Sequence, residues 1–464
     1  MKKIVVIGGG ITGLSAVYTL QKYAAQAEQE MELTLIEAGQ ELGGKIRTVK
    51  DGEFIMETGA DSIVARKSNV APLLEELGLN TEVVYNATGR SFIYTEEGLK
   101  KIPEESLFGI PLSLESLATS ELVSAEGKVE ALKDFYTPNE TFTEQDSLGS
   151  FLEYFLGAEL VRKQIEPVVS GVYSGELDDL TIASTFPYLL QYKNEYGSLM
   201  KGLGEHKQKF LSGGSKKFIS FDTGMSELIG TMERKLEGVR LRKGTKVRRV
   251  RHGLEGYEIT TSDDEKLYAD YVVLAVPHQA AQAMLQHAAL DKDFDRLSNR
   301  SLISIYAAFD VPDEQLPEDG TGFIVGKDSD LKCNACTWTS RKWAHTSANN
   351  RLLVRLFYKS SGAHYEELVR MDENQLLDVA LDDVRRSLGI TAKPVMHNVT
   401  KWMDSMPNYH LQHPQLVKSL ERTMEEQFPK VLLAGCSYYG VGIPDCIADG
   451  ERAAKRILEE TSIQ

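Results

Sequence analysis

The sequence is poor in cysteine and in proline, and both shortages restrict the kind of protein it encodes. Only 4 of its 464 residues are cysteines and 14 are prolines, which argues against a disulfide-stapled secreted scaffold and a proline-rich disordered chain. Cys333 and Cys336 form one C-x-x-C pair, whereas a zinc ribbon requires two. We therefore expect ordinary thiols, no bound metal, and a large hydrophobic core as the source of stability.

Long apolar runs and positive charge are also scarce. The stretch 271–290 has no charged residue but contains proline, histidine and glutamine, and a membrane span needs ~20 mostly apolar residues. Lys and Arg number 52 against 68 Asp and Glu, so the net charge is −16. A field of that sign disfavours nucleic acid and anionic membranes as partners. The first residues are too few for a signal peptide, and we expect a soluble, cytoplasmic protein.

The first forty residues predict a strand–turn–helix–strand unit. Residues 4–7 and 33–36 are apolar enough for buried strands, and residues 14–29 have apolar side chains at helical spacing. The turn between the first strand and the helix is a G-x-G-x-x-G pattern that consists of Gly8, Gly9, Gly10, Ile11, Thr12 and Gly13. Such glycines let the backbone approach a pyrophosphate at the positive end of the helix.

The glycine pattern alone is weak evidence for a dinucleotide site, and Glu37 strengthens it. It lies 24 residues after Gly13, where the second strand ends. A carboxylate there accepts hydrogen bonds from a ribose 2′-hydroxyl and repels a 2′-phosphate. The two features together predict an adenine dinucleotide other than NADP. A second glycine pair, Gly43 and Gly44, follows at once, and a plain NAD dehydrogenase has no need of it.

These motifs resemble the FAD-binding fingerprint of the flavin amine oxidase superfamily, through residues 8–13, 37–38, 43–44 and 57–59. Within that superfamily, two further segments resemble the protoporphyrinogen and coproporphyrinogen oxidases. One is Gly-Ile-Pro-Asp at residues 442–445, where amine oxidases carry an aromatic-cage segment. The other is Val-Ser-Gly-Val-Tyr-Ser-Gly at residues 169–175. The resemblance covers nearly the whole chain and is strongest to the soluble bacterial coproporphyrinogen III oxidases.

The resemblance implies FAD as the cofactor and assigns its contacts residue by residue. For the pyrophosphate it implies Gly8, Gly9, Gly10, Ile11, Thr12, Gly13 and Lys45. For the ribose it implies Glu37 and Ala38, and for the adenine the backbone of Val247. Toward the flavin ring it implies Gly59, Ala60, Asp61, Ser62, Trp402, Val441, Gly442 and Ile443.

The same resemblance implies oxidation of coproporphyrinogen III to coproporphyrin III in haem biosynthesis. Six hydrogens would leave the macrocycle in three two-electron hydride transfers to FAD, with oxygen as acceptor and hydrogen peroxide released, so no catalytic side chain is assigned. The four propionates of this substrate need basic residues at the mouth of an acidic protein. Lys67 is the first candidate, and Gly171 is expected to allow close approach of the macrocycle. Arg90, Arg341, Lys342 and Lys359 are weaker candidates for the propionates. A ferrochelatase is a further implied partner, through transient contact.

The expected fold class is α/β, with a Rossmann-like FAD-binding domain that is discontinuous in sequence. We assign residues 1–75, 209–285 and 425–464 to it. A mixed-sheet substrate domain would comprise residues 76–94 and 286–424, and a helical domain residues 95–208. Within the helical domain, the leucines and glutamates of residues 114–136 predict one long amphipathic helix.

Three other functions remain open from the residues. A protoporphyrinogen IX oxidase would act on a substrate with only two propionates. Another superfamily oxidase would act on amines or polyenes, although the amine-cage residues are missing near residue 440. A non-catalytic binding protein on the same fold, as in the Rab GDP-dissociation inhibitors, need not keep a complete FAD fingerprint, whereas this chain has one.

Overall fold

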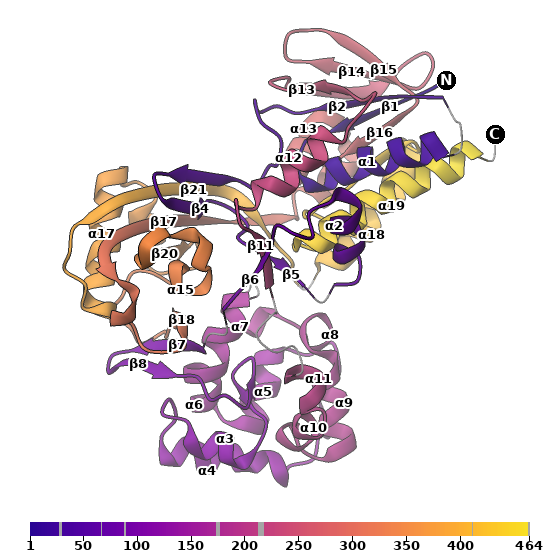
Figure 1. The fold of residues 1–464 in the computed structure, drawn as a ribbon. Coiled ribbons are helices and arrows are strands. Elements are labelled where there is room, and N and C mark those ends of the chain that lie inside the picture. Colours follow the sequence, from indigo (N-terminus) through magenta and orange to yellow (C-terminus); the bar gives the residue numbers. More distant parts are fainter. Residues whose placement is uncertain are drawn as a thin grey trace.

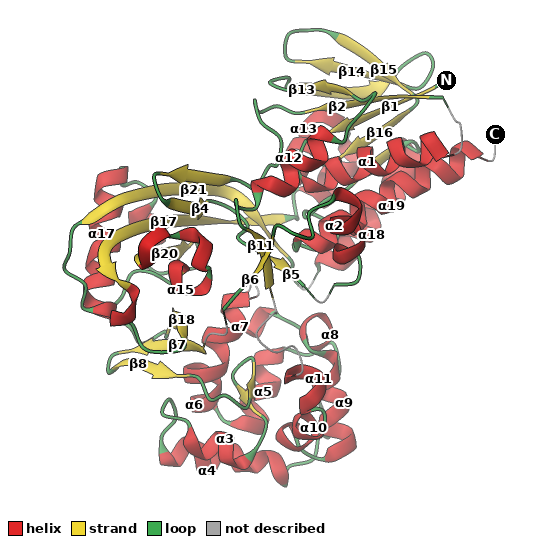
Figure 2. Ribbon diagram, in the orientation of Figure 1, coloured by secondary structure: helices red, strands yellow, loops and turns green. Residues whose placement is uncertain are grey.

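The computed structural model describes residues 1–26, 30–65, 67–87, 90–172, 177–211, 218–410 and 412–462. They form three units: a parallel sheet between helices, a curved mixed sheet, and a group of short helices (Figures 1 and 2). Both chain ends lie in the first unit, beside strands from the middle of the chain. The structure therefore has the expected α/β class with a discontinuous first unit. The residue boundaries that we propose for the three domains stay a prediction.

The parallel sheet has five strands in the order β12–β2–β1–β16–β22. Their bounds are β1 (Lys2–Ile7), β2 (Met31–Ile36), β12 (Arg240–Arg242), β16 (Tyr271–Leu274) and β22 (Val431–Leu433). Strand β1 lies in the middle, with Ile4 opposite Leu33 of β2 on one side and Tyr271 of β16 on the other. These strands are rich in apolar residues, as parallel strands covered on both faces usually are.

Each face of the parallel sheet has its own cover. One face packs on α1 (Ile11–Gln26), α2 (Val70–Leu77), α12 (Ser226–Arg234) and α19 (Ile443–Ser462). The other packs on the antiparallel strands β13 (Val247–His252), β14 (Tyr257–Thr261) and β15 (Lys266–Ala269), and on α13 (His278–Leu285), α14 (Ala288–Phe294) and α18 (His413–Gln427). Along β1, Ile4 and Val6 enter the first core, whereas Val5 and Ile7 enter the second. This is the alternation expected along a strand.

The mixed sheet has seven strands in the order β21–β17–β20–β19–β18–β7–β8. Their bounds are β7 (Arg90–Thr95), β8 (Gly98–Lys101), β17 (Ser298–Pro312), β18 (Gly320–Val325), β19 (Ala335–Trp338), β20 (Arg351–Lys359) and β21 (Pro394–Asn408). One face packs on α17 (Glu373–Leu388), and α15 (Thr339–Lys342) and α16 (Tyr365–Leu368) lie at strand ends. In the register of β17 and β20, Leu302 lies opposite Lys359 and Ser304 opposite Phe357.

Two small sheets lie where the large units meet (Figure 1). The hairpin β3 (Thr48–Asp51) and β4 (Phe54–Glu57) packs through Phe54 and Met56 against side chains of β17, β20 and β21. The other small sheet has the order β5 (Ile63–Val64), β11 (Phe218–Phe221) and β6 (Val83–Tyr85). The hairpin thus packs on the mixed sheet, whereas Ile63 and Ile219 of the other small sheet belong to the core of the parallel sheet.

The helical unit consists of short helices rather than the single long one predicted for residues 114–136. Its elements are β9 (Ser106–Leu107), β10 (Ile110–Pro111), α3 (Leu114–Thr119), α4 (Ala125–Ala131), α5 (Leu148–Leu156), α6 (Ala158–Leu160), α7 (Glu166–Val172), α8 (Ile182–Thr185), α9 (Pro187–Tyr196), α10 (Leu199–Glu205) and α11 (Lys207–Leu211). The prediction of one helix was wrong because two serines interrupt it. Ser124 caps α4 by accepting a hydrogen bond from the Gly127 N–H, and Ser120 donates to Gln164 at 2.5 Å. Serine hydroxyls compete in this way with helix continuation.

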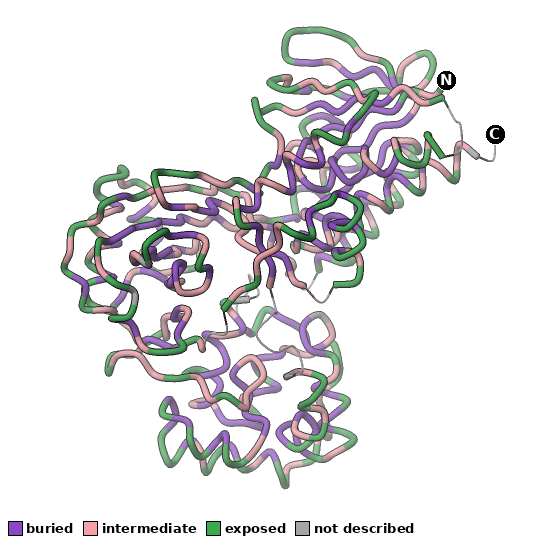
Figure 3. Tube along the Cα trace, viewed as in Figure 1, coloured by how far each residue is buried: buried purple, intermediate pink, exposed green. Residues whose placement is uncertain are grey.

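Buried residues run through the centre of each unit (Figure 3). Within the described ranges, no helix is long and apolar enough to cross a membrane. In the same part of the chain, no cluster of three or more His, Cys, Asp or Glu side chains is suited to a metal ion. All four cysteines are free thiols, and Cys333 and Cys336 are buried in the core of the mixed sheet.

Candidate cofactor site

A cavity of about 540 Å³ lies where the parallel sheet meets the mixed sheet. Its lining includes the loops that follow β1, β2, β12, β16 and β22. All five strands are parallel, so these loops meet at the carboxyl edge of the sheet, where open α/β sheets bind their ligands. One end of the cavity is rich in glycine and lies at the start of α1. The other end is apolar and lies against β17, β20 and β21.

The glycines at the glycine-rich end of the cavity have two different roles. A methyl group on Gly13 would lie 1.9 Å from the Gly8 carbonyl oxygen, and one on Gly8 would lie 2.3 Å from that of Ala275. These two glycines are therefore needed for packing, and Gly8 also has a φ of +106°. At Gly10, no described atom lies within 4 Å of such a methyl group. Gly10 lines the cavity, so its missing side chain leaves room for a ligand.

Polar groups surround this glycine-rich end. The α1 helix begins at Ile11, and the first N–H groups of a helix have no partner within the helix and attract anions. The Glu37 carboxylate accepts hydrogen bonds from the N–H groups of Gly9 and Gly39, each at 2.7 Å. Lys45 donates from Nζ to Cys436 Sγ at 3.3 Å. This end therefore combines oriented amides, the Glu37 carboxylate and the Lys45 ammonium group.

The other end of the cavity suits a flat apolar ring. Its lining includes Leu302, Phe357, Met406, Val441 and Ile443. Arg355 also lines the cavity here, although its residue is only 3% exposed.

Comparison with known proteins assigns the family. The family model of the flavin containing amine oxidoreductases matches residues 11–458. The chain belongs to this family. The coproporphyrinogen III oxidase of Bacillus subtilis is 34% identical over 462 residues, with 98% of each chain covered. The Staphylococcus aureus enzyme of the same name is 31% identical over 99% of each chain. A crystal structure from Exiguobacterium sp. 255-15, provisionally named a protoporphyrinogen oxidase, has a TM-score of 0.89 and 32% identity over 99% of each chain.

The protein is thus a flavin-dependent oxidoreductase with FAD as its cofactor. The cavity fits FAD, because a pyrophosphate suits the open space at Gly10 and the amides of α1, and an isoalloxazine ring suits the apolar end. Glu37 would hold the ribose hydroxyls and Lys45 would face the phosphates. When bound, the flavin supplies the two-electron acceptor of the reaction.

The structure brings most of the predicted FAD residues together around this one cavity. Those that line it are Gly8, Gly10, Ile11, Thr12, Glu37, Ala38, Lys45, Gly59, Ala60, Val247, Val441 and Ile443. Within the described residues, the remaining six lie outside the lining, and these are Gly9, Gly13, Asp61, Ser62, Trp402 and Gly442. Trp402 contacts a lining residue: it donates from Nε1 to the Thr58 carbonyl at 2.7 Å, and its ring lies against Gly59. The roles of these six residues toward FAD stay predictions.

Neither of the two predicted substrate residues is among those that line the cavity. Lys67 Nζ pairs with Asp445 Oδ1 at 2.9 Å, on the exposed side of α19. Gly171 lies in α7, where a methyl group would come within 3.2 Å of Ile324 of β18. Residues 173–175 of the motif quoted above lie outside the described residues. The carbonyl of Ser170 accepts a hydrogen bond from Lys359 Nζ at 2.5 Å.

Two of the other basic candidates for the propionates, Arg90 and Lys342, have acidic partners. Arg90 forms an ion pair with Glu104, and Lys342 forms one with Asp61 at 3.0 Å. A substrate carboxylate at either position must therefore compete with a carboxylate of the protein.

Sequence reasoning missed part of the lining. Ala275, Val276 and Pro277 follow β16 directly, and the carboxyl end of that predicted strand was a signal for them. Arg355 and Phe357 carried no local signal, because only the register of β17 and β20 brings them to the cavity.

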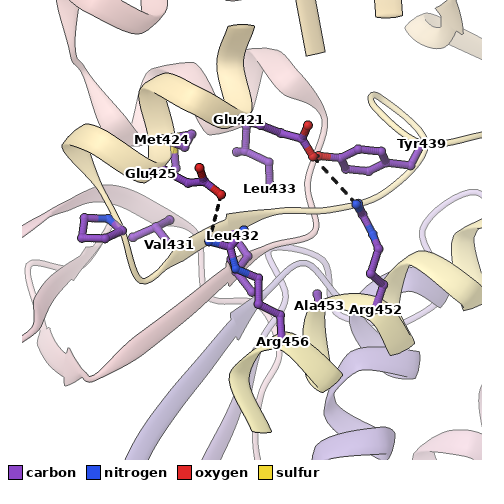
Figure 4. Close-up of a pocket in the computed structure, with 11 residues that line it drawn as sticks. Glu421, Met424, Glu425, Val431, Leu432, Leu433, Tyr439, Arg452, Ala453 and Arg456 are labelled. Atoms are coloured by element: carbon purple, nitrogen blue, oxygen red, sulfur yellow. Dashed lines mark hydrogen bonds and ion pairs between the residues drawn. The ribbon is translucent and has the colours of Figure 1, made fainter. Parts of the chain in front are cut away.

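A smaller cavity of about 60 Å³ lies between α18 and α19, beside the edge strand β22 (Figure 4). Glu421 and Glu425 of α18 pair with Arg452 and Arg456 of α19 at 3.8 and 3.3 Å. The Tyr439 hydroxyl donates to Glu421 at 2.6 Å, and the Arg452 guanidinium stacks on the Tyr439 ring. These charged groups pair with one another. We therefore interpret the cluster as a structural support for the loop after β22 rather than as a ligand site.

Glu57, behind the apolar end of the cavity, is expected to make stability depend on pH. Burial raises its pKa to about 7, although hydrogen bonds from the Met225 N–H and the Thr48 hydroxyl oppose this rise. The folded protein then keeps the Glu57 proton between pH 4.5 and 7, where the unfolded chain loses it. The free energy of unfolding should therefore fall by about 3 kcal/mol over this interval from this group alone.

Replacing Glu57→Gln should remove this part of the pH dependence, which urea unfolding at pH 5, 6, 7 and 8 would measure. The variant should gain stability relative to the wild type as pH rises to 7. Glu121→Gln, at an exposed carboxylate, is the control and should leave the slope unchanged. A Glu57→Gln slope equal to that of the wild type would contradict the prediction.

Proposed function

We propose that this flavoenzyme oxidises coproporphyrinogen III to coproporphyrin III, with oxygen as the final acceptor. The macrocycle loses six hydrogens, as three hydrides and three protons, and three O₂ become three H₂O₂. The observation that carries the proposal is the similarity to coproporphyrinogen III oxidases along the entire chain, at 34% identity over 98% of each sequence. The Gly-Ile-Pro-Asp segment at residues 442–445, beside the cavity, supports it.

The substrate's carboxylates can meet basic residues even though the protein is acidic. The Lys67–Asp445 pair is about half exposed on the lysine side, with 48% and 37% of the two side chains accessible. Exposed pairs of this kind stabilise by only about 0–1 kcal/mol. A propionate of the substrate can therefore replace Asp445 as the partner of Lys67 at little cost.

Protoporphyrinogen IX is the second candidate substrate, because the Exiguobacterium protein of 32% identity has that provisional name. It has two propionates where coproporphyrinogen has four, so it would use fewer basic contacts. Side-by-side aerobic turnover of the two porphyrinogens, followed by porphyrin fluorescence, decides between them. We expect coproporphyrinogen to have the higher kcat/KM, and the reverse order would overturn the assignment.

Lys67 provides a sharper test of the same proposal. Lys67→Gln should raise the KM for coproporphyrinogen by about 3–10-fold, since one charge-assisted hydrogen bond contributes on the order of 1 kcal/mol. Asp445→Asn is the matched control, because it removes the competing carboxylate and should lower KM or leave it unchanged. Equal increases in KM from the two substitutions would indicate that the Lys67–Asp445 ion pair, and not contact of Lys67 with the substrate, determines the KM.

Oxygen as acceptor is tested by the coupled release of hydrogen peroxide, in a ratio of three per porphyrin. Cytoplasmic location and transfer of the product to a ferrochelatase stay predictions. Cell fractionation and the effect of added ferrochelatase on turnover would examine them.

A further inference from the structure

Arg355 is a buried cation at the apolar end of the FAD cavity. It lies on β20 and lines the cavity, and only 3% of the residue is exposed. Burying a guanidinium costs free energy unless hydrogen bonds and charges compensate for it. Because Arg355 lines the cavity, it is a candidate for an interaction with the bound cofactor.

Among the described residues, every hydrogen bond of Arg355 goes to a neutral acceptor. Its Nε donates to Ser304 Oγ at 2.7 Å. Its Nη2 donates to the carbonyls of Thr58 and Gly59 at 3.2 and 3.1 Å. Among the described residues these bonds occupy Nε and Nη2, so Nη1 is the donor that remains for a bound group. The guanidinium also stacks on Phe357, 4.6 Å from the ring centre.

The nearby carboxylates do not cancel this charge. Burial alone would raise the pKa of Asp61, but the charges of Lys342 and Arg355 outweigh burial and hold it at about 2. Asp61 is thus ionised, but its ion pair at 3.0 Å is with Lys342. Glu57 has a pKa of about 7, so near neutral pH much of it is uncharged. Near neutral pH the two cations therefore face one full anion, Asp61, and one partly ionised carboxyl group, Glu57, so a surplus of positive charge remains beside the apolar end of the cavity.

A hydride adds one negative charge to a neutral flavin ring unless a proton follows. In a site with little water, a fixed cation lowers the free energy of the charged, reduced ring much more than in bulk solvent. It has no comparable effect on the neutral, oxidised ring. We propose that Arg355 raises the two-electron reduction potential of the bound flavin by supplying this charge. The proposal concerns FAD alone and does not depend on which porphyrinogen the enzyme oxidises.

The test is the equilibrium reduction of the FAD-loaded enzyme against a reference dye, without oxygen or porphyrinogen. Arg355→Met should lower the ratio of reduced to oxidised flavin at a given potential at least about tenfold, which is about 30 mV for a two-electron couple. Arg355→Lys keeps the charge and should stay within about threefold of the wild type. Ser304→Ala removes the bond to Nε but not the charge, so it should change the ratio less than twofold.

A second variant, with the opposite expected effect on the flavin potential, tests the proposal if Arg355→Met does not fold or does not retain FAD. Asp61→Asn removes the anion of the cluster and should raise the ratio of reduced to oxidised flavin. The proposal is overturned if Arg355→Met changes only FAD affinity or thermal stability while the potential stays the same. It is equally overturned if Asp61→Asn leaves the potential unchanged or lowers it. Either result would make Arg355 a support for the Thr58–Gly59 backbone only.

Discussion

Replacing Gly10 by alanine is expected to produce a folded protein that no longer holds FAD. The backbone at Gly10 has no positive φ, and its added methyl group would meet no described atom within 4 Å. The apoprotein should therefore unfold at the same temperature as wild-type apoprotein. The methyl group would instead occupy the space through which a pyrophosphate approaches the amides of α1. We expect FAD affinity to fall by about 100-fold, equivalent to about 2.7 kcal/mol.

Flavin fluorescence titration of the apoproteins measures this loss, and circular dichroism measures the fold. Two other glycine variants bracket the expected result. Gly230 lies within α12 and is not among the residues that line the cavity, so Gly230→Ala should bind FAD normally. Gly13→Ala would place a methyl group 1.9 Å from the Gly8 carbonyl and should disturb the fold itself. Normal FAD affinity in Gly10→Ala would mean that the phosphates bind elsewhere in the cavity.

The contrast between Gly10 and Gly13 shows what local sequence can predict. The glycine turn, the strand before it and Glu37 lie within one βαβ unit, so pattern and spacing determine their geometry. The predicted contacts therefore gather at one end of one cavity. The break in the helix predicted for residues 114–136 was missed because the spacing of apolar residues carries no information about the hydrogen bonds of Ser120 and Ser124.

The apolar end of the cavity was harder to predict for a different reason. Leu302, Phe357 and Met406 belong to three strands that are far apart in sequence. Only the register between β17, β20 and β21 brings them to one face. Neither the composition nor the periodicity of a single strand reveals that register. Arg355 is the clearest case, since in the sequence it reads as one of many charged residues on a strand.

The helical unit offers the largest expected effect on stability. Lys193 of α9 and Asp134 form an ion pair at 2.9 Å, and both side chains are 0% exposed. Lys193 Nζ also donates to the carbonyls of Asp134 and Gly197. The Asp134 carboxylate in turn accepts hydrogen bonds from Ser198 Oγ and from the N–H groups of Leu199 and Met200 at the start of α10. The pair therefore joins three segments of the unit.

Lys193→Met should reduce the free energy of unfolding by about 3–5 kcal/mol, because it leaves the Asp134 charge buried without its partner. Lys163→Met is the matched control: its ion pair with Glu159 is also 2.9 Å long, but the lysine side chain is 49% exposed. Exposed pairs contribute about 0–1 kcal/mol, so the control should unfold close to the wild type. Urea denaturation followed by circular dichroism compares the two. A loss below about 1 kcal/mol in Lys193→Met would contradict this prediction.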